Sequence, residues 1–181
     1  MRRLSVLLII TAGLLLGQET RKEVVNPSPN PADDTKSNSA QVPEVYAIAG
    51  HFDRIVIFRF KYDADILAGM EEMVKQQKIR NAVILSALGS VRGYQVHQVS
   101  NRTFPSKDTF VANPTAPADI IGMNGYIIDG RIHAHLTLSN PDKAFGGHLE
   151  PGTRVFTFAV ITLGVLNDGV DISRVDDKNY R

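Results

Sequence analysis

The stretch RIHAHLTL, residues 131–138, guides the interpretation of the fold because its side chains alternate between two kinds. In a β-strand, successive side chains point to opposite faces, so this alternation sorts them into two rows. The stretch therefore predicts a strand with one face in the core and one polar face. The apolar row is Ile132, Ala134, Leu136 and Leu138, and the polar row is Arg131, His133, His135 and Thr137.

Three of the five histidines fall within sixteen residues, at positions 133, 135 and 148. His133 and His135 would lie roughly 7 Å apart on one strand face, where their imidazoles can converge on a metal ion. His148 is the candidate third ligand, and Gly146 and Gly147 before it let the backbone turn or approach another segment closely. The alternative is that His133 and His135 occupy a solvent-facing strand surface and His148 lies in a loop. Spacing alone leaves both interpretations open.

Length and composition indicate an ordinary globular protein. A chain of 181 residues is long enough for one domain with a substantial core. The absence of cysteine excludes disulfides, thiolate metal sites and a cysteine nucleophile.

The N-terminus resembles an export signal. Arg2 and Arg3 precede an apolar run over residues 4–16, which is typical of a secretory signal peptide. The run is short for a membrane span, which needs about twenty residues. Residues 1–17 therefore predict a signal peptide and a secreted or periplasmic protein with no membrane span after cleavage, the alternative being a retained N-terminal anchor. Gln18 stands where a lipoprotein would carry its lipid-bearing cysteine, so lipid attachment there is excluded.

Residues 18–41 are rich in Glu, Lys, Asn, Pro, Ser and Asp. Such a segment buries too little apolar surface to offset its ordering entropy, which predicts a disordered linker.

The folded domain is predicted to occupy residues 42–181. Asp63 and Asp65 offer N-cap oxygens before a helix over residues 64–78, and the prolines at 105, 114 and 117 favour a long loop over residues 100–118. Asp129-Gly130 is a tight-turn dipeptide leading into the histidine strand. Further β-rich runs predict strands at residues 44–49, 54–60, 81–88, 91–99, 119–128 and 154–166.

The other two histidines carry weaker signals. His51 follows Gly50 and is predicted to be a turn or surface histidine. His97 shares its predicted strand face with mixed neighbours and is predicted to be a structural histidine.

The order of these motifs resembles the PPC domain, the plant and prokaryote conserved domain also known as DUF296, over residues of about 50 to 177. The matching pieces are the single helix after two strands, Ala87-Leu88-Gly89-Ser90 after a buried strand, the 129–136 segment, and Gly146-Gly147-His148-Leu149 before a long strand.

The resemblance implies an α+β single domain with a largely antiparallel β-sheet, one main amphipathic helix and assembly into a homotrimer. It also implies that His133, His135 and His148 are the family's three recurrent histidines. They would form a metal site that suits zinc by default, with nickel, copper and iron as alternatives. Arg131, Gly146 and Gly147 are predicted to contact a small polar ligand. One departure is Ala159, which stands near a position where family members often carry an acidic residue.

The family name also suggests a DNA-binding protein, but two observations oppose this. The Arg-Gly-Arg-Pro core of an AT-hook does not occur in the sequence. Residues 42–181 hold fifteen Lys or Arg and fifteen Asp or Glu, so the domain lacks the positive excess that neutralises phosphates. We therefore expect no nucleic-acid partner.

A metal-dependent hydrolase or lyase is the remaining alternative, because a three-histidine site can activate a bound water. Its acid or base would be Glu150, Asp119 or Asp129, each of which also has a plain structural role as a loop, strand or turn residue. The sequence favours a binding role over catalysis.

Overall fold

The computed structural model describes residues 18–25, 40 and 42–176. The predicted signal peptide and most of the predicted linker lie outside these residues. Among the helices of the described part, none is long and apolar enough to cross a membrane.

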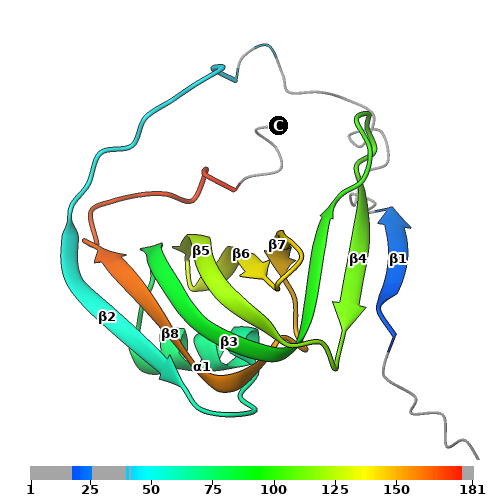
Figure 1. Ribbon diagram of the computed structural model, residues 1–181. Helices are drawn as coiled ribbons and strands as arrows, with labels where there is room; N and C mark the ends of the chain where they lie inside the picture. The colour runs from blue at the N-terminus through cyan, green and yellow to red at the C-terminus, as the bar shows by residue number, and fades with distance from the viewer. Residues whose placement is uncertain (1–17, 26–39, 41, 177–181) are drawn as a thin grey trace, which may run out of the picture.

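The chain folds into a curved antiparallel sheet with one α-helix, so the α+β prediction is confirmed (Figure 1). In order the elements are β1 Thr20–Val25, β2 Phe52–Phe60, α1 Ile66–Gln76, β3 Ala82–Val99, β4 Lys107–Asn113, β5 Ala118–Ile128, β6 Arg131–Ser139, β7 Ala144–Leu149 and β8 Arg154–Leu166.

The long strand β3 organises the sheet, because it pairs with four other strands. Its first half pairs with β8 and β5, and its second half pairs with β7 and β4. Since β5 also pairs with β6, and β6 with β7, the strands β3, β5, β6 and β7 form a closed ring. This strand ring brings the end of β3 beside β7, far from it in sequence.

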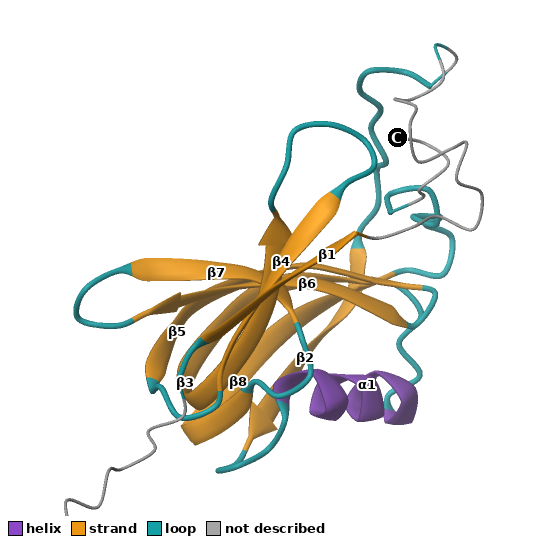
Figure 2. Ribbon diagram, turned by 90° about the vertical axis from the view of Figure 1, so that its right-hand side faces the viewer, coloured by secondary structure: helices purple, strands orange, loops and turns teal. Residues whose placement is uncertain are grey.

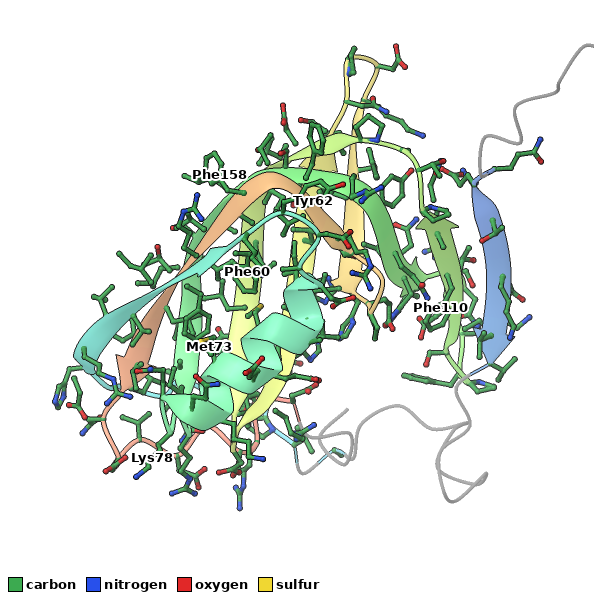
Figure 3. All side chains as sticks on the ribbon, turned by 90° about the horizontal axis from the view of Figure 1, so that it is seen from below. Phe60, Tyr62, Met73, Lys78, Phe110 and Phe158 are labelled. Atoms are coloured by element: carbon green, nitrogen blue, oxygen red, sulfur yellow. The ribbon has the colours of Figure 1, made fainter. Side chains whose placement is uncertain are left out.

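The helix α1 covers one face of the curved sheet (Figure 2). The side chain of Asp65 accepts a hydrogen bond from the backbone N of Ala68 at 3.1 Å, which is the predicted N-cap. Ile66, Met70 and Val74 recur every fourth residue and are buried against the sheet. Figure 3 shows Met73 and Phe60 between α1 and the sheet.

Several elements differ from the sequence prediction. The predicted loop over residues 100–118 contains strand β4, whose ends are marked by the prolines that suggested a loop. The predicted strand over residues 44–49 is an irregular segment, and its Val45 is exposed. The strands predicted on either side of Gly89-Ser90 are one strand, because Gly89 continues the chain at a φ of 139° through an irregularity in its pairing.

The predicted linker also differs at its start, because Thr20–Val25 form β1 and pair with β4. Lys107 holds this edge strand through an ion pair with Glu23 at 3.2 Å. The hydroxyl of Tyr94 donates a hydrogen bond to Glu19 at 3.1 Å. Polar side chains and the free edge of β4 thus order a segment whose composition alone predicts disorder.

Candidate metal centre

A row of histidines crosses three neighbouring strands of the ring. His135 on β6 lies opposite His148 on β7, and His148 lies opposite His97 on β3. Because directly opposed residues of an antiparallel pair project to the same face, their imidazoles lie side by side. His133, two residues before His135, shares that face. These four residues are called the histidine cluster below.

The structure brings together the three histidines predicted from the sequence. The imidazole centroids of His133 and His135 are 5.3 Å apart. The imidazole centroid of His148 lies 5.0 Å from that of His133 and 5.5 Å from that of His135. The Nε2 atoms of His133 and His135 are 3.2 Å apart. His148 lies in strand β7, which the sequence did not predict, and not in a loop.

His97 is the member that sequence reasoning missed. Its imidazole stacks on that of His148 at a centroid distance of 4.5 Å. Nothing in the sequence around His97 identifies it, since its place depends on the pairing of β3 with β7 across the strand ring. The sequence does identify His51 correctly as a surface residue, because its side chain is 73% exposed.

Carboxylates contact the Nδ1 side of three cluster histidines. Oδ2 of Asp176 lies 2.9 Å from Nδ1 of His133. Oε1 of Glu150 lies 2.6 Å from Nδ1 of His97 and 3.4 Å from Nδ1 of His148. Asp108 is a more distant neighbour of His97, with Oδ2 at 3.8 Å from Nε2. A carboxylate at Nδ1 holds the imidazole in place and leaves Nε2 as the metal-binding nitrogen.

The surroundings lower the pKa of two of the imidazoles. The pKa of His135 is lowered by burial first and then by the neighbouring His133 and His97. The pKa of His148 is lowered by burial first and then by the neighbouring His97 and His133, whereas the carboxylate of Glu150 raises it. Neutral imidazole is the form that binds a metal ion, so these shifts reduce competition from protons.

One pair of donor atoms has the spacing that a tetrahedral ion requires. Two nitrogens bound to zinc at 2.0 to 2.1 Å are roughly 3.3 to 3.4 Å apart in a tetrahedron, and the Nε2 atoms of His133 and His135 are 3.2 Å apart. The group of described residues whose ligand atoms all lie within 4.8 Å of one another is His97, His148 and Glu150, a different set from the predicted His133, His135 and His148. The two sets share His148.

The sequence matches the Plants and Prokaryotes Conserved (PCC) domain over residues 47–167. The chain belongs to this family. The resemblance read from the motifs is thereby confirmed, and the histidine cluster lies within the PCC domain, whereas Asp176 lies beyond its matched end.

Two curated relatives match part of the chain. The bifunctional protein GlmU of Synechococcus sp. (strain JA-3-3Ab) is 25% identical over 111 residues, which cover 61% of this chain and 17% of that protein. GlmU of Synechococcus sp. (strain JA-2-3B'a(2-13)) is 27% identical over 100 residues, covering 55% and 15%. This chain therefore spans less than a fifth of the length of these relatives.

Solved structures share the fold. A metal-containing protein from Archaeoglobus fulgidus superposes with a TM-score of 0.54 at 22% identity, covering 68% of this chain and 86% of that one. A PPC protein from Pyrococcus horikoshii has a TM-score of 0.54 at 18% identity, covering 68% and 85%. A candidate DNA-binding protein from Bacteroides thetaiotaomicron has a TM-score of 0.52 at 17% identity, covering 66% and 83%.

The two glycines before His148 have a structural explanation within the PCC domain. A Cβ atom at Gly146 would lie 2.1 Å from the carbonyl oxygen of Leu136, and one at Gly147 would lie 2.3 Å from that of His97. Both positions therefore need glycine for close strand approach. Their contact with a ligand, and that of Arg131 at the exposed start of β6, stays a prediction.

Of the three acidic candidates, Glu150 is the one that contacts the histidine cluster. Asp129 lies in the β5–β6 turn and accepts a hydrogen bond from Nε of Arg80 at 2.9 Å. Asp119 pairs with Ser139 at the far end of the β5–β6 pair. Ala159, where relatives were expected to carry an acid, is fully buried in the core.

A cavity of about 380 Å³ lies beside His133 and His135. Its volume is within the usual range for small-molecule sites. Its other lining residues are Asn124, Gly125, Tyr126, Ile128, Val175 and Asp176.

Proposed function

We propose that this PCC-domain protein binds one divalent metal ion through Nε2 of His133, His135 and His148. The observation that carries the proposal is the 3.2 Å separation of the Nε2 atoms of His133 and His135, which matches two ligands of one tetrahedral ion. Zinc is the metal that three imidazole ligands with an open position favour, and nickel, copper and iron are the alternatives.

The open coordination position would accept a small polar ligand. Three protein ligands leave the fourth position of a tetrahedral ion for water or another molecule. The cavity beside His133 and His135 gives such a molecule room. We therefore place the ligand of the site in that cavity.

Calorimetric titration with zinc after chelator treatment tests the metal site. Wild type and His51→Ala are expected to bind one ion per chain, because His51 is an exposed histidine outside the cluster. His135→Ala is expected to lose at least tenfold in affinity. A wild-type protein that binds no zinc, nickel, copper or iron would refute the proposal.

The competing donor set is separated by two further variants. If His97, His148 and Glu150 hold the ion, His97→Ala abolishes binding and His133→Ala does not. The proposed set requires the reverse, with His133→Ala causing the larger loss. The two variants distinguish the two donor sets because His97 belongs only to one set and His133 only to the other.

We also propose that the chain self-associates as a homotrimer through the outer face of its sheet. Large apolar side chains lie exposed there, opposite the buried core, and Figure 3 shows Phe158 on this outer side. Soluble monomers rarely expose extended apolar patches. The exposed residues are Phe52, Ile55 and Ile57 on β2, Leu85 and Leu88 on β3, Ile121 and Tyr126 on β5, and Phe156 and Phe158 on β8.

Sedimentation velocity tests the assembly. Ile57→Asp should shift the protein to monomer, because Ile57 is 64% exposed and its charge would be buried in the interface. Lys61→Asp, which changes an exposed residue after β2, is the control and should stay trimeric. A monomeric wild type would refute the proposal.

Nucleic-acid binding is a second candidate, favoured by the description of the B. thetaiotaomicron protein. The formal neutrality of residues 42–181 opposes it. Salt-sensitive binding of duplex DNA near physiological ionic strength would establish nucleic-acid binding and contradict our expectation that the protein has no nucleic-acid partner.

Export is proposed from the sequence of residues 1–17. Fractionation of expressing bacteria should find the protein outside the cytoplasm, and replacing Arg2 and Arg3 by Glu should retain it inside.

A further inference from the structure

His133 has a different partner at each of its two ring nitrogens. Its Nδ1 lies 2.9 Å from Oδ2 of Asp176, and its Nε2 lies 3.2 Å from Nε2 of His135. A carboxylate accepts a proton but offers none when ionised, so Nδ1 of His133 must be the protonated nitrogen. An imidazole with a single proton on Nδ1 carries its lone pair on Nε2, the atom that lies within hydrogen-bonding distance of Nε2 of His135.

Asp176 reaches this position on a C-terminal segment, residues 170–176, that follows the last strand. Val170 and Ile172 are buried against Ile128, and these three residues form a small core cluster of their own. Nδ2 of Asn81 donates a hydrogen bond to the carbonyl oxygen of Val170 at 3.2 Å. The segment is thus anchored on the end of β5 before it reaches the histidine cluster.

Two further contacts fix the end of the segment. The hydroxyl of Tyr46 donates a hydrogen bond to the carbonyl oxygen of Arg174 at 2.8 Å. The backbone N of Val175 donates to the carbonyl oxygen of Ile172 at 3.0 Å and closes a turn. None of these contacts uses the carboxylate of Asp176, so a substitution there leaves the anchoring of the segment intact.

We infer that Asp176 is a positioning residue of the metal centre: its carboxylate orients the imidazole of His133 and keeps the proton on Nδ1, so that Nε2 can bind the ion. This inference rests on the proposed metal-binding function. Since the PCC match ends at residue 167, the centre of this chain would be completed by a segment outside the matched domain.

An ordinary surface ion pair is the competing interpretation, because both side chains are about a third exposed. The two interpretations differ in what they predict for Asp176→Asn. Loss of an ordinary surface ion pair would change the stability and the metal affinity of the protein little. Loss of a positioning carboxylate changes the tautomer of His133 and lowers metal affinity by about 10- to 100-fold.

The first experiment needs no metal. Long-range ¹H–¹⁵N NMR spectra of the full chain, kept free of metal with a chelator at pH 7.5, report which ring nitrogen of His133 carries the proton. We expect the Nδ1–H form in wild type and a mixture of tautomers in Asp176→Asn. An unchanged tautomer in Asp176→Asn would overturn the inference.

The second experiment is zinc affinity measured by competition with a chromophoric chelator. Asp176→Asn is expected to lose about 10- to 100-fold in affinity, and Asp176→Glu to recover part of it by restoring the carboxylate. Asp171→Asn is the matched control, since the Asp171 carboxylate in the same segment accepts a hydrogen bond from the backbone N of Ser173 at 2.9 Å. Its affinity should equal that of wild type.

The outcomes separate this inference from the proposed function. Wild-type zinc binding that Asp176→Asn leaves unchanged would overturn the positioning role alone. A wild type that binds no metal would overturn the metal centre and the inference with it. Thermal stability of Asp176→Asn in chelator should stay that of wild type, and a large loss would show a structural role instead.

Discussion

Gly147→Ala should damage the strand ring at the histidine cluster. A Cβ atom at this position would lie 2.3 Å from the carbonyl oxygen of His97, where ordinary contact begins at 3.4 Å. Strands β7 and β3 would therefore have to separate by about 1 Å at the pair that places His148 beside His97. Overpacking of this kind costs about 1 to 3 kcal/mol.

The measurement is urea unfolding in chelator, which removes any contribution from a bound metal. Gly122→Ala is the matched control, because it also lies in a strand and a Cβ there meets nothing within 4 Å. Gly122→Ala should be neutral or stabilise the protein by up to about 1 kcal/mol. If both variants unfold at the wild-type urea concentration, the close approach of β7 to β3 is not what requires glycine at 147, and a ligand contact becomes the better explanation.

Two further predictions concern pH and the core. Because the pKa values of His135 and His148 are lowered in the folded protein, the unfolded chain binds protons that the folded one excludes. In chelator, the free energy of unfolding should be constant above the ordinary histidine pKa of about 6.5 and should fall as the pH drops below it. Urea unfolding at pH 7.5 and at pH 5.5 measures this difference. His135→Ala should make the difference smaller. Met70→Ala should destabilise the protein by about 2 to 5 kcal/mol, because Met70 is fully buried between α1 and the sheet, while Met73→Ala at a partly buried position should cost less in the same thermal unfolding assay.

Local patterns predicted the elements whose causes are local. The helix follows from the Asp65 cap and the spacing of Ile66, Met70 and Val74. The β5–β6 turn follows from Asp129-Gly130, which adopt the positive φ angles of 48° and 77° that this dipeptide accommodates. The histidines at 133 and 135 share a strand face because two-residue spacing in a strand requires it.

What the sequence did not reveal depends on pairing between distant segments. The segment Thr20–Val25 looks disordered by composition and becomes a strand because the edge of β4 is available to it. His97 joins the cluster only when β3 meets β7. Asp176 lies 43 positions after His133 in the sequence and reaches it through the packing of residues 170–176, which follow no periodic pattern.

The strand ring is closed by a very short pairing. Only Val96–Leu149 and His97–His148 join β3 to β7, whereas the other pairings of the ring are longer. The histidine cluster lies across this junction, because His97 is on β3 and His148 is on β7. Closing the strand ring therefore adds His97 to the three histidines that β6 and β7 already bring together. A fluctuation that separates β3 from β7 would remove His97 from the cluster and leave His148 opposite His135 in the β6–β7 pair. The stacking of His97 on His148 would therefore report whether the strand ring is closed.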